Sequence, residues 1–450
     1  MMFFLGIDLG TSFFKSGVFD TSGKMLGFAR EPVPLHQQAK VSELSHTGFI
    51  NTIRSCVELA IKNAGLQPHD IVSLSYGSQA NSFILLDEDY NEISPFSIWN
   101  DEQVDLMDEV ENFAAKSNFR NTTGIGIAIS KQFLINRLKW LQNTKTQFWR
   151  RVAHVLTMPD YLCFKLTGEM VTDASTTSLT GLLDFKKGHW WLEATDMIGV
   201  DSEQLSRVLP FGAKAGRVND KGNFLGLKEG TLFCCGGLDH HVAAIGAGVG
   251  KLFDISESTG TVIAAVEHGD DCGILKNICV AKGLSELACF RMAFNENGAV
   301  ALEWYQKNYA REYTIDELIT MAGKVSDGSD ALVALPCANS YRGLNGFLNI
   351  RQSHHHGHFV RAIMESTARS LDLLFKQLQI DSHARIASTG GGARSLLWKR
   401  IKNSVTGREL STLAYSEAAC FGAGMIAVAG YGVFNSIYDV QSAWLRSTPE

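Results

Sequence analysis

Two short apolar runs open the chain, at residues 3–9 and 13–19, and a Gly-Thr-Ser turn separates them. Runs rich in Phe and Val on either side of such a turn predict two strands joined as a hairpin. A similar layout returns at residues 252–266, where apolar segments flank Ser-Thr-Gly-Thr. The second half of the chain therefore opens with the same pattern as the first, although two hairpins alone do not establish a duplication.

The remaining pattern alternates short apolar runs with longer segments of helical spacing. Further strands are predicted at residues 71–79, 82–87, 231–237 and 385–388. Helices are predicted at residues 48–64, 240–250, 358–379, 396–405 and 418–429, and over most of 102–170. Strands that alternate with helices indicate an α/β protein. Glycines cluster at residues 248–251, which favours a domain boundary there.

Composition narrows the class of protein. The chain has 450 residues, of which 45% are apolar and 20% charged, so two or three globular domains are expected. A net charge of −6 argues against a nucleic-acid surface. Nine scattered cysteines without a CxxC motif predict reduced thiols and a cytoplasmic location. Neither a signal peptide nor an 18-residue apolar run is recognised, so no membrane association is expected.

The turn after the first strand is a candidate phosphate site. Asp8 ends the apolar run, Gly10, Thr11 and Ser12 form the turn, and Lys15 follows. A glycine lets the backbone approach a phosphate, and turn amides form an anion-binding nest. Asp8 would then hold Mg²⁺ or its water, since Mg²⁺ prefers carboxylate and phosphate oxygens. The alternative is a plain hairpin in which Asp8 bonds to its own turn.

The second turn, Ser258-Thr259-Gly260-Thr261, carries similar chemistry. By itself it is typical of a simple hairpin. Two such turns together, however, could bind a triphosphate from both sides.

Two further glycine segments each allow two interpretations. Asp239 follows Gly236-Gly237 and precedes a helix of small residues, so it is either a helix-capping aspartate or a general base for an attacking hydroxyl. Ser388-Thr389-Gly390-Gly391-Gly392-Ala393 is either a tight strand-to-helix loop or a surface for adenine or ribose.

Taken in order, these segments resemble the FGGY carbohydrate kinases, a family of the actin-like, ribonuclease-H-like ATPase superfamily. The similar segments are GIDLGTSFFK at 6–15, GGLDHHVAAIGAG at 236–248, STGTV at 258–262, STGGGARSLLWKRI at 388–401 and SEAACFGAG at 416–424. SIWNDEQ at 97–103, MPDYLCFKLTG at 158–168 and VTDASTTSLTGLLDF at 171–185 also fit, as do His358-Phe359 and the following residues 362–365. The resemblance covers nearly the whole chain.

The resemblance implies an α/β fold of two duplicated ribonuclease-H-like domains, 1–248 and 249–450, flanking a deep catalytic cleft. The first would bind the sugar and supply the base, and the second would bind ATP. Position by position, it implies Asp239 as the base and Asp8 as the acid beside Mg²⁺, with both acids near that ion directly or through water. The implied ATP and phosphate contacts are Gly10, Thr11, Ser12, Lys15, Gly260, Thr261, Gly391, Gly392 and Ala393. The implied sugar contacts are Gln79, Trp99, Asp101 and Asp239.

Phosphorylation of a small sugar or polyol by Mg·ATP is therefore expected, and the WND segment at residues 99–101 favours a ketose such as xylulose. A homodimer would agree with this class. The alternatives are a sugar-sensing pseudokinase and an actin-like ATP-binding switch. Three residues depart from the family pattern, Gln103 for an arginine, Arg137 for a lysine and Asn349 for a glycine.

The remaining polar residues are interpreted as structural. Asp160 and Asp173 are expected to cap or brace their loops. The histidines at 354–356 and 358 are predicted to form a polar loop that leads into a helix, in preference to a metal site.

Overall fold

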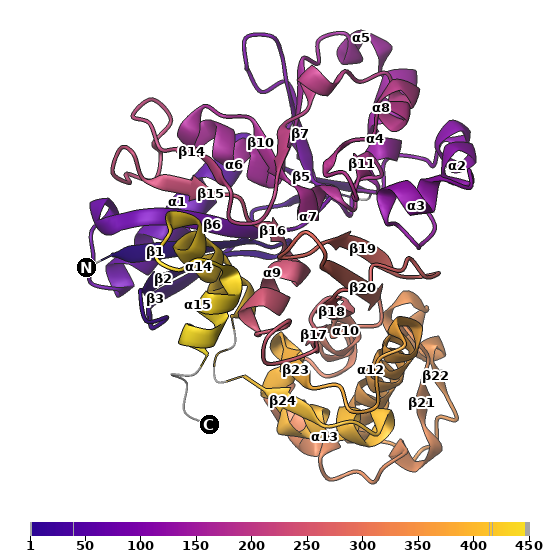
Figure 1. Cartoon of the computed structure of the whole chain (residues 1–450). Coiled ribbons are helices and arrows are strands. Elements are labelled where there is room, and N and C mark those ends of the chain that lie inside the picture. Colours follow the sequence, from indigo (N-terminus) through magenta and orange to yellow (C-terminus); the bar gives the residue numbers. More distant parts are fainter. Residues whose placement is uncertain (1, 39, 414, 416, 446–450) are drawn as a thin grey trace. The chain divides into compact units, whose positions relative to one another are not determined.

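The protein is described by a computed structural model over residues 2–38, 40–413, 415 and 417–445 (Figure 1). It consists of two compact units. The first unit holds the chain up to Gly246, the segment Gly269–Phe290 and the chain from Ala418 onward. The second holds Ala247–His268 and Arg291–Glu417. The chain thus leaves the first unit close to residue 248 but returns to it twice.

A seven-stranded sheet forms the centre of the first unit, in the order β14-β15-β6-β1-β2-β3, with β16 also paired to β6. Its strands are β1 (Phe3–Leu9), β2 (Phe13–Asp20), β3 (Met25–Pro32), β6 (Ile71–Ser78), β14 (Lys214–Arg217), β15 (Leu232–Cys234) and β16 (Gly237–Leu238). β1 and β2 are antiparallel, which confirms the predicted hairpin. β1, β15 and β16 run parallel to β6, so the carboxyl ends of β1, β6 and β16 lie at one edge.

Smaller elements surround this sheet. A five-stranded sheet has the order β4 (His36–Gln38), β5 (Val41–Leu44), β8 (Phe96–Ser97), β7 (Phe83–Leu86) and β9 (His154–Thr157). The other strands of this unit are β10 (Val171–Asp173), β11 (Leu183–Asp184), β12 (His189–Trp190), β13 (Arg207–Leu209) and β19 (Cys279–Lys282). Its α-helices are α1 (His46–Asn63), α2 (Asp108–Ala114), α3 (Phe119–Thr123), α4 (Leu134–Thr144), α5 (Thr146–Trp149), α6 (Met158–Thr167), α7 (Ala174–Thr177), α8 (Leu192–Ile198), α9 (Asp239–Gly246), α14 (Ala418–Tyr431) and α15 (Ile437–Trp444).

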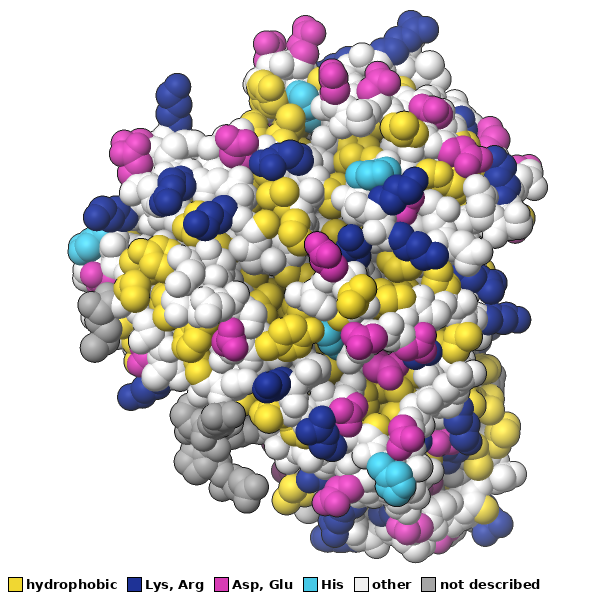
Figure 2. Space-filling model, in the orientation of Figure 1, with side chains coloured by type: hydrophobic (Ala, Val, Ile, Leu, Met, Phe, Trp, Pro, Cys, Tyr) yellow, Lys and Arg dark blue, Asp and Glu magenta, His cyan; other side chains and the backbone are white. Residues whose placement is uncertain are grey.

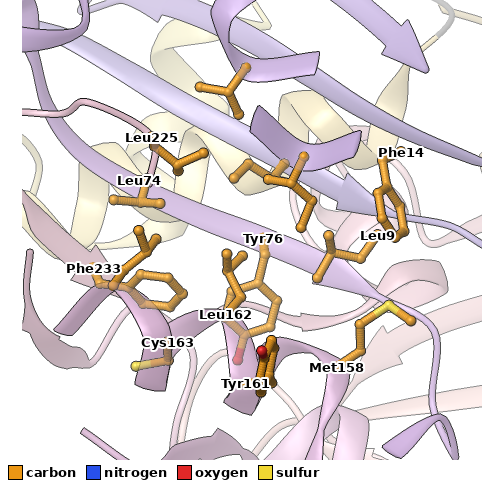
Figure 3. Packing of buried hydrophobic residues seen from close by; sticks show 14 of the residues in the cluster. Leu9, Phe14, Leu74, Tyr76, Met158, Tyr161, Leu162, Cys163, Leu225 and Phe233 are labelled. Atoms are coloured by element: carbon orange, nitrogen blue, oxygen red, sulfur yellow. The ribbon is translucent and has the colours of Figure 1, made fainter. Parts of the chain in front are cut away.

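Apolar residues from the sheet, α1 and α6 form the core of the first unit. Leu9, Tyr76, Leu162 and Phe233 pack in it and are all nearly inaccessible to water (Figure 3). Burial of each such side chain contributes about 1.5–3 kcal/mol to folding. α14 approaches β1 so closely that a Cβ at Gly6 would lie 2.2 Å from the Cys420 carbonyl oxygen, which explains the small residues there.

The second unit contains its own sheet. β17 (Ile255–Thr259) pairs antiparallel with β18 (Ile263–Gly269) and parallel with β23 (Ile386–Thr389), which pairs with β24 (Leu410–Thr412). β20 (Cys289–Asn295) leads the chain back into this unit. The other elements are β21 (Val333–Ala334), β22 (Phe347–Leu348), α10 (Val300–Tyr309), α11 (Ile315–Ala322), α12 (His356–Leu378) and α13 (Leu396–Thr406). The helices α10, α11 and α12 share a second apolar core.

Most predicted elements are confirmed within a few residues. The long helical region expected at 102–170 is wrong in part: it holds short helices, loops and strand β9. Its anchors Trp140, Phe148, Trp149 and Tyr161 belong to three separate helices, so apolar content did not indicate one continuous element.

The cysteines also differ from expectation. Cys272 and Cys289 form a disulfide, with Cα atoms 5.5 Å apart, whereas reduced thiols were predicted. The chain folds back between them, a proximity that sequence spacing does not reveal. The other seven cysteines are free thiols.

Residues expected to be structural do have local roles. Asp160 completes the capping box at the start of α6, and Asp173 caps α7 by accepting the Thr176 amide. His354 and His355 precede α12 as predicted, and His355 caps the helix. For His356 and His358 the predicted loop is wrong, because α12 already begins at His356; His358 lies 3.1 Å from Asp330. Asn349 has a φ of 62°, a left-handed conformation that explains why the family has glycine there.

Candidate active site

Asp8 lies where β1 reaches the carboxyl edge of the first unit's sheet. Its side chain is only 8% exposed. Lys15 faces it across the β1–β2 hairpin, and the Lys15 Nζ lies 3.2 Å from Asp8 Oδ2. The ion pair offsets the cost of burying this carboxylate. The structure thus brings together the predicted acid and the predicted basic residue of the first phosphate loop.

The adjoining turn is held by two side chains that the sequence assigned to sugar binding. The Trp99 indole Nε1 donates to the Thr11 hydroxyl at 2.8 Å. That hydroxyl donates to Gln79 Oε1 at 3.3 Å, and Gln79 Nε2 donates to the Gly10 carbonyl at 3.2 Å. The Ser12 carbonyl accepts from the Val33 amide at 3.0 Å, while the Ser12 residue is exposed. The turn therefore has a defined shape before any ligand is present.

Gln79 is engaged on both sides of its amide. Besides its contacts to the turn, its Oε1 accepts from Ser82 Oγ at 3.0 Å, and the residue is 5% exposed. In this conformation Gln79 bonds to Thr11 and to Ser82, the residue before β7, and Trp99 also bonds to Thr11.

Asp101 faces away from this group. Its carboxylate accepts from the Ser42 amide at 3.1 Å and from both the backbone and side-chain nitrogens of Gln103, at 2.8 and 2.9 Å. The residue is 1% exposed. With Arg137, Asp101 and Gln103 line a cavity of about 200 Å³. Gln103 thus binds Asp101 as a neutral donor where the family has an arginine.

Asp239 begins α9 directly after the short strand β16. The carboxylate Oδ1 accepts the backbone amide of His240 at 2.8 Å. α9 packs closely on Gly77 of β6, because a Cβ there would lie 3.3 Å from the Val242 Cβ of α9. Both interpretations of Asp239 therefore fit the geometry: the residue starts a helix, and its carboxylate is oriented at the sheet edge.

Asp8 and Asp239 converge on that edge. In the strand register, Asp8 of β1 and Gly237 of β16 both lie opposite Gly77 of β6, one on each side. Two strand spacings separate them, about 10 Å. Asp239 follows two residues later. Ligands of α/β sheets bind outside the carboxyl ends of parallel strands, and the two acids occupy that place.

The second unit brings the other two glycine turns together. Thr259 ends β17, and Thr389 ends its parallel neighbour β23. A Cβ on Gly390 would lie 3.1 Å from the Thr259 carbonyl oxygen, and one on Gly392 would lie 2.8 Å from the Thr259 Cβ. Side chains larger than hydrogen would push the turns apart.

The predicted ligand residues of these turns are accessible. Gly260, Thr261 and Gly391 are exposed, and Ala393 is half-buried, with its amide bonded to the Gly390 carbonyl at 3.2 Å. Gly392 is buried beneath them. The two turns thus expose adjoining backbone surfaces within this unit.

A buried ion pair supports both turns, and sequence reasoning missed it. Lys402 of α13 and Glu257 of β17 are fully inaccessible, and Lys402 Nζ lies 2.8 Å from Glu257 Oε1. The same ammonium donates to Thr259 Oγ1 at 2.8 Å. Ser388 donates to Glu257 as well. The partners lie 145 residues apart, and each stands among other polar residues, so no local pattern indicates the pair.

Strand ends that carry acids and glycine turns define a protein that handles phosphate groups. Comparison with known proteins makes the class specific. The N-terminal domain model of the FGGY family of carbohydrate kinases matches residues 3–246, and the C-terminal domain model matches residues 328–431. The chain belongs to the FGGY family of carbohydrate kinases.

Full-length relatives and solved structures agree. The chain is 26% identical to a xylulose kinase of Lactococcus lactis, over 99% of this chain and 91% of that protein. It is 24% identical to an autoinducer-2 kinase of Escherichia coli, over 99% and 89% respectively. The fold matches the ligand-bound xylulose kinase of Lactobacillus acidophilus with a TM-score of 0.86 and 20% identity, over 98% of this chain and 92% of that one.

The protein is therefore a sugar kinase that uses ATP as phosphate donor. The comparisons give no support to the sugar-sensing pseudokinase or the actin-like switch. No helix in the described part of the chain is both long and apolar enough to span a membrane. Positive and negative side chains are interspersed on the face drawn in Figure 2.

Proposed function

We propose that this kinase phosphorylates a small ketose, with xylulose as the first candidate, and that Asp239 is its general base. Several full-length relatives, including those of Lactococcus lactis and Bacillus subtilis, are xylulose kinases. The observation that carries the proposal is the placement of both acids at the carboxyl edge of the sheet. Asp8 lies opposite Gly77 on one side, and Asp239 follows two residues after Gly237, which lies opposite Gly77 on the other side.

In the proposed reaction, a sugar hydroxyl attacks the γ-phosphorus of ATP. The hydroxyl proton passes to the Asp239 carboxylate, the new P–O bond forms, and ADP leaves with the electron pair of the broken bond. The backbone amides around Gly10 and Gly260 would contact the phosphates, with Thr11, Ser12 and Thr261 beside them. Gly391, Gly392 and Ala393 would contact the adenosine moiety.

The donor set fits Mg²⁺ as the metal. Among the described residues no group of three or more His, Cys, Asp or Glu side chains could hold a metal ion. An ion bound through Asp8, with Asp239 directly or through water, would take most of its oxygens from phosphate and water, as Mg²⁺ usually does. When bound, such an ion neutralises phosphate charge. Lys15 would then be the nearest cation of this loop.

The family pattern supports sugar binding by residues 1–248 and ATP binding by residues 249–450. Trp99 would border the sugar through its ring, because its indole N–H already donates to Thr11. Gln79 would need to release a contact to the turn to reach a sugar hydroxyl. Asp101 would need to rotate away from Ser42 and Gln103 to reach a sugar hydroxyl. We also propose a cytoplasmic location, because ATP is a cytoplasmic metabolite.

The test is ADP release with Mg·ATP over a panel of xylulose, ribulose, gluconate, glycerol and autoinducer-2. A strong preference for one ketose supports the proposal, whereas preference for gluconate, glycerol or autoinducer-2 refutes the ketose assignment. Asp239→Asn keeps the size of the side chain and is expected to lower kcat by about 10²–10⁴-fold with sugar affinity retained. The exposed Asp220→Asn serves as the matched control. Turnover near wild type in the Asp239 variant would exclude it as the base.

A further inference from the structure

The chain on both sides of Asp239 is held by one buried hydroxyl. Ser175 lies on α7 and is 2% exposed. Its Oγ accepts the backbone amide of Leu238 at 3.0 Å, one residue before Asp239. The same oxygen lies 2.8 Å from His241 Nδ1, two residues after Asp239. A single side chain therefore fixes the position of the strand end and of the first helical turn.

The His241 ring is buried against aromatic neighbours. The ring is 2% exposed and stacks on Phe290, with centroids 4.7 Å apart and planes 10° apart. Phe290 in turn contacts Phe211 edge to face at 5.7 Å. Since the ring can neither slide nor tilt freely against these aromatic neighbours, the hydrogen bond to Ser175 is set at a defined point.

The short helix α7, which carries Ser175, is also bonded to the central strand of the sheet. Asp173, the cap of α7, accepts the Tyr76 hydroxyl at 2.8 Å, and Tyr76 belongs to the central strand β6. Burial raises the pKa of Asp173. The anchoring is tight, because a Cβ at Gly237 would lie 2.9 Å from Ser175 Oγ. β6, α7 and the start of α9 thus form one connected polar structure inside the first unit.

We infer that Ser175 and His241 are positioning residues for Asp239, holding its carboxylate in the orientation that proton transfer requires. The inference rests on the proposed role of Asp239 as base. A displacement of about 1 Å at a reacting group can cost about 10²-fold in rate. Neither Ser175 nor His241 needs to touch the substrate for this role.

The experiment compares four variants. Ser175→Ala removes both contacts, and Ser175→Thr keeps the hydroxyl. His241→Phe keeps the stacking on Phe290 but loses the bond to Ser175. Ser178→Ala is the matched control, because it removes a buried hydroxyl of the same segment that bonds to the Ser175 carbonyl and not to α9.

We expect Ser175→Ala to lower kcat by about 10–100-fold, with sugar KM and melting temperature close to wild type. Ser175→Thr should restore most of the rate, His241→Phe should lie between, and Ser178→Ala should match wild type. A Ser175→Ala variant with kcat within twofold of wild type overturns the inference. A Ser175→Ala variant in which kcat, sugar affinity and melting temperature all fall together also overturns the inference, because that result indicates a merely structural role.

A crystallographic readout separates this inference from the proposed function. Crystal structures of wild type and Ser175→Ala should show the Asp239 carboxylate displaced or in several orientations in the variant. An unmoved Asp239 overturns the positioning role whatever the substrate is. A displaced Asp239 together with unaltered turnover in Asp239→Asn would instead retain the positioning and reject Asp239 as the base.

Discussion

Replacing Lys402 by methionine tests whether the buried ion pair holds the second unit's glycine turns. The substitution nearly preserves side-chain volume but removes the only charge that pairs with Glu257 in the described contacts. At 2.8 Å and an effective dielectric constant of 20, the Coulomb attraction is about 6 kcal/mol before desolvation is counted. Glu257 keeps hydrogen bonds from Ser388 and from Thr259, the latter at 3.0 Å, which offsets part of the loss.

The net destabilisation expected for Lys402→Met is about 3–5 kcal/mol, the usual cost of leaving one buried charge unpaired. For a unit of this size, that is a fall of about 10 °C in its melting temperature. The variant should also raise the KM for ATP, because the ammonium no longer fixes Thr259 beside Gly260.

Differential scanning calorimetry measures the melting temperature, and ADP release gives the KM. Arg400→Met, an exposed cation on the same helix α13, is the control and should change little. The double variant Lys402→Met, Glu257→Gln removes both charges and should regain about 2–3 kcal/mol. A single variant that loses less than 1 kcal/mol, or a double variant no more stable than the single, would refute this reasoning.

Three further outcomes follow from the contacts. Burial raises the pKa of Asp160 from 3.8 to about 6, so the folded state binds a proton more tightly than the unfolded state, and the free energy of unfolding falls as pH rises between those values. In urea unfolding, the stability of Asp160→Asn relative to wild type should therefore increase by about 2–3 kcal/mol from pH 3.5 to 6.5, and a constant difference would contradict this. Cys272→Ser should lower stability by about 3 kcal/mol, and dithiothreitol should lower the melting temperature of wild type but not of the variant; a wild-type melting temperature that dithiothreitol leaves unchanged would contradict this. Asn349→Val should cost about 1–2 kcal/mol at its φ of 62° while Asn349→Gly stays near neutral, and equal melting temperatures of the two variants would speak against the left-handed conformation.

The parts of the fold predicted from sequence are those encoded locally. The hairpin at residues 3–20 is set by apolar runs around a glycine turn, and the structure has β1 and β2 in register there. α1 begins after Ser45, whose side chain accepts the Gly48 amide, a cap that sequence spacing can indicate. Within 102–170 a capping box marks the start of α6, but no local signal marks strand β9, which exists because β7 offers an edge to pair with.

The candidate site likewise contains residues that a local sequence pattern predicts and residues that it does not. Asp8, Asp239 and the glycine turns were found because each carries its chemistry within a few residues of chain. Ser175 was not singled out, since a serine among Ser and Thr residues has no distinguishing pattern, and its partners lie 63 and 66 residues away. Gln79 was assigned to the sugar, but its contacts to Gly10 and Thr11 depend on how β6 lies beside β1.

Three acids, Asp8, Asp239 and Glu257, share one arrangement in the structure. Asp8 is paired by Lys15 on the adjacent strand, Asp239 accepts the next amide of its own helix, and Glu257 is paired by Lys402. Each carboxylate is oriented by a partner that the fold supplies. In the proposed mechanism, Asp8 and Asp239 would therefore need little reorganisation when charge develops during phosphoryl transfer. The same logic predicts where such an enzyme is most sensitive to substitution. Lys15 and His240 lie within the segments that resemble the family, whereas Lys402 lies one residue beyond them and was therefore not indicated by the motif.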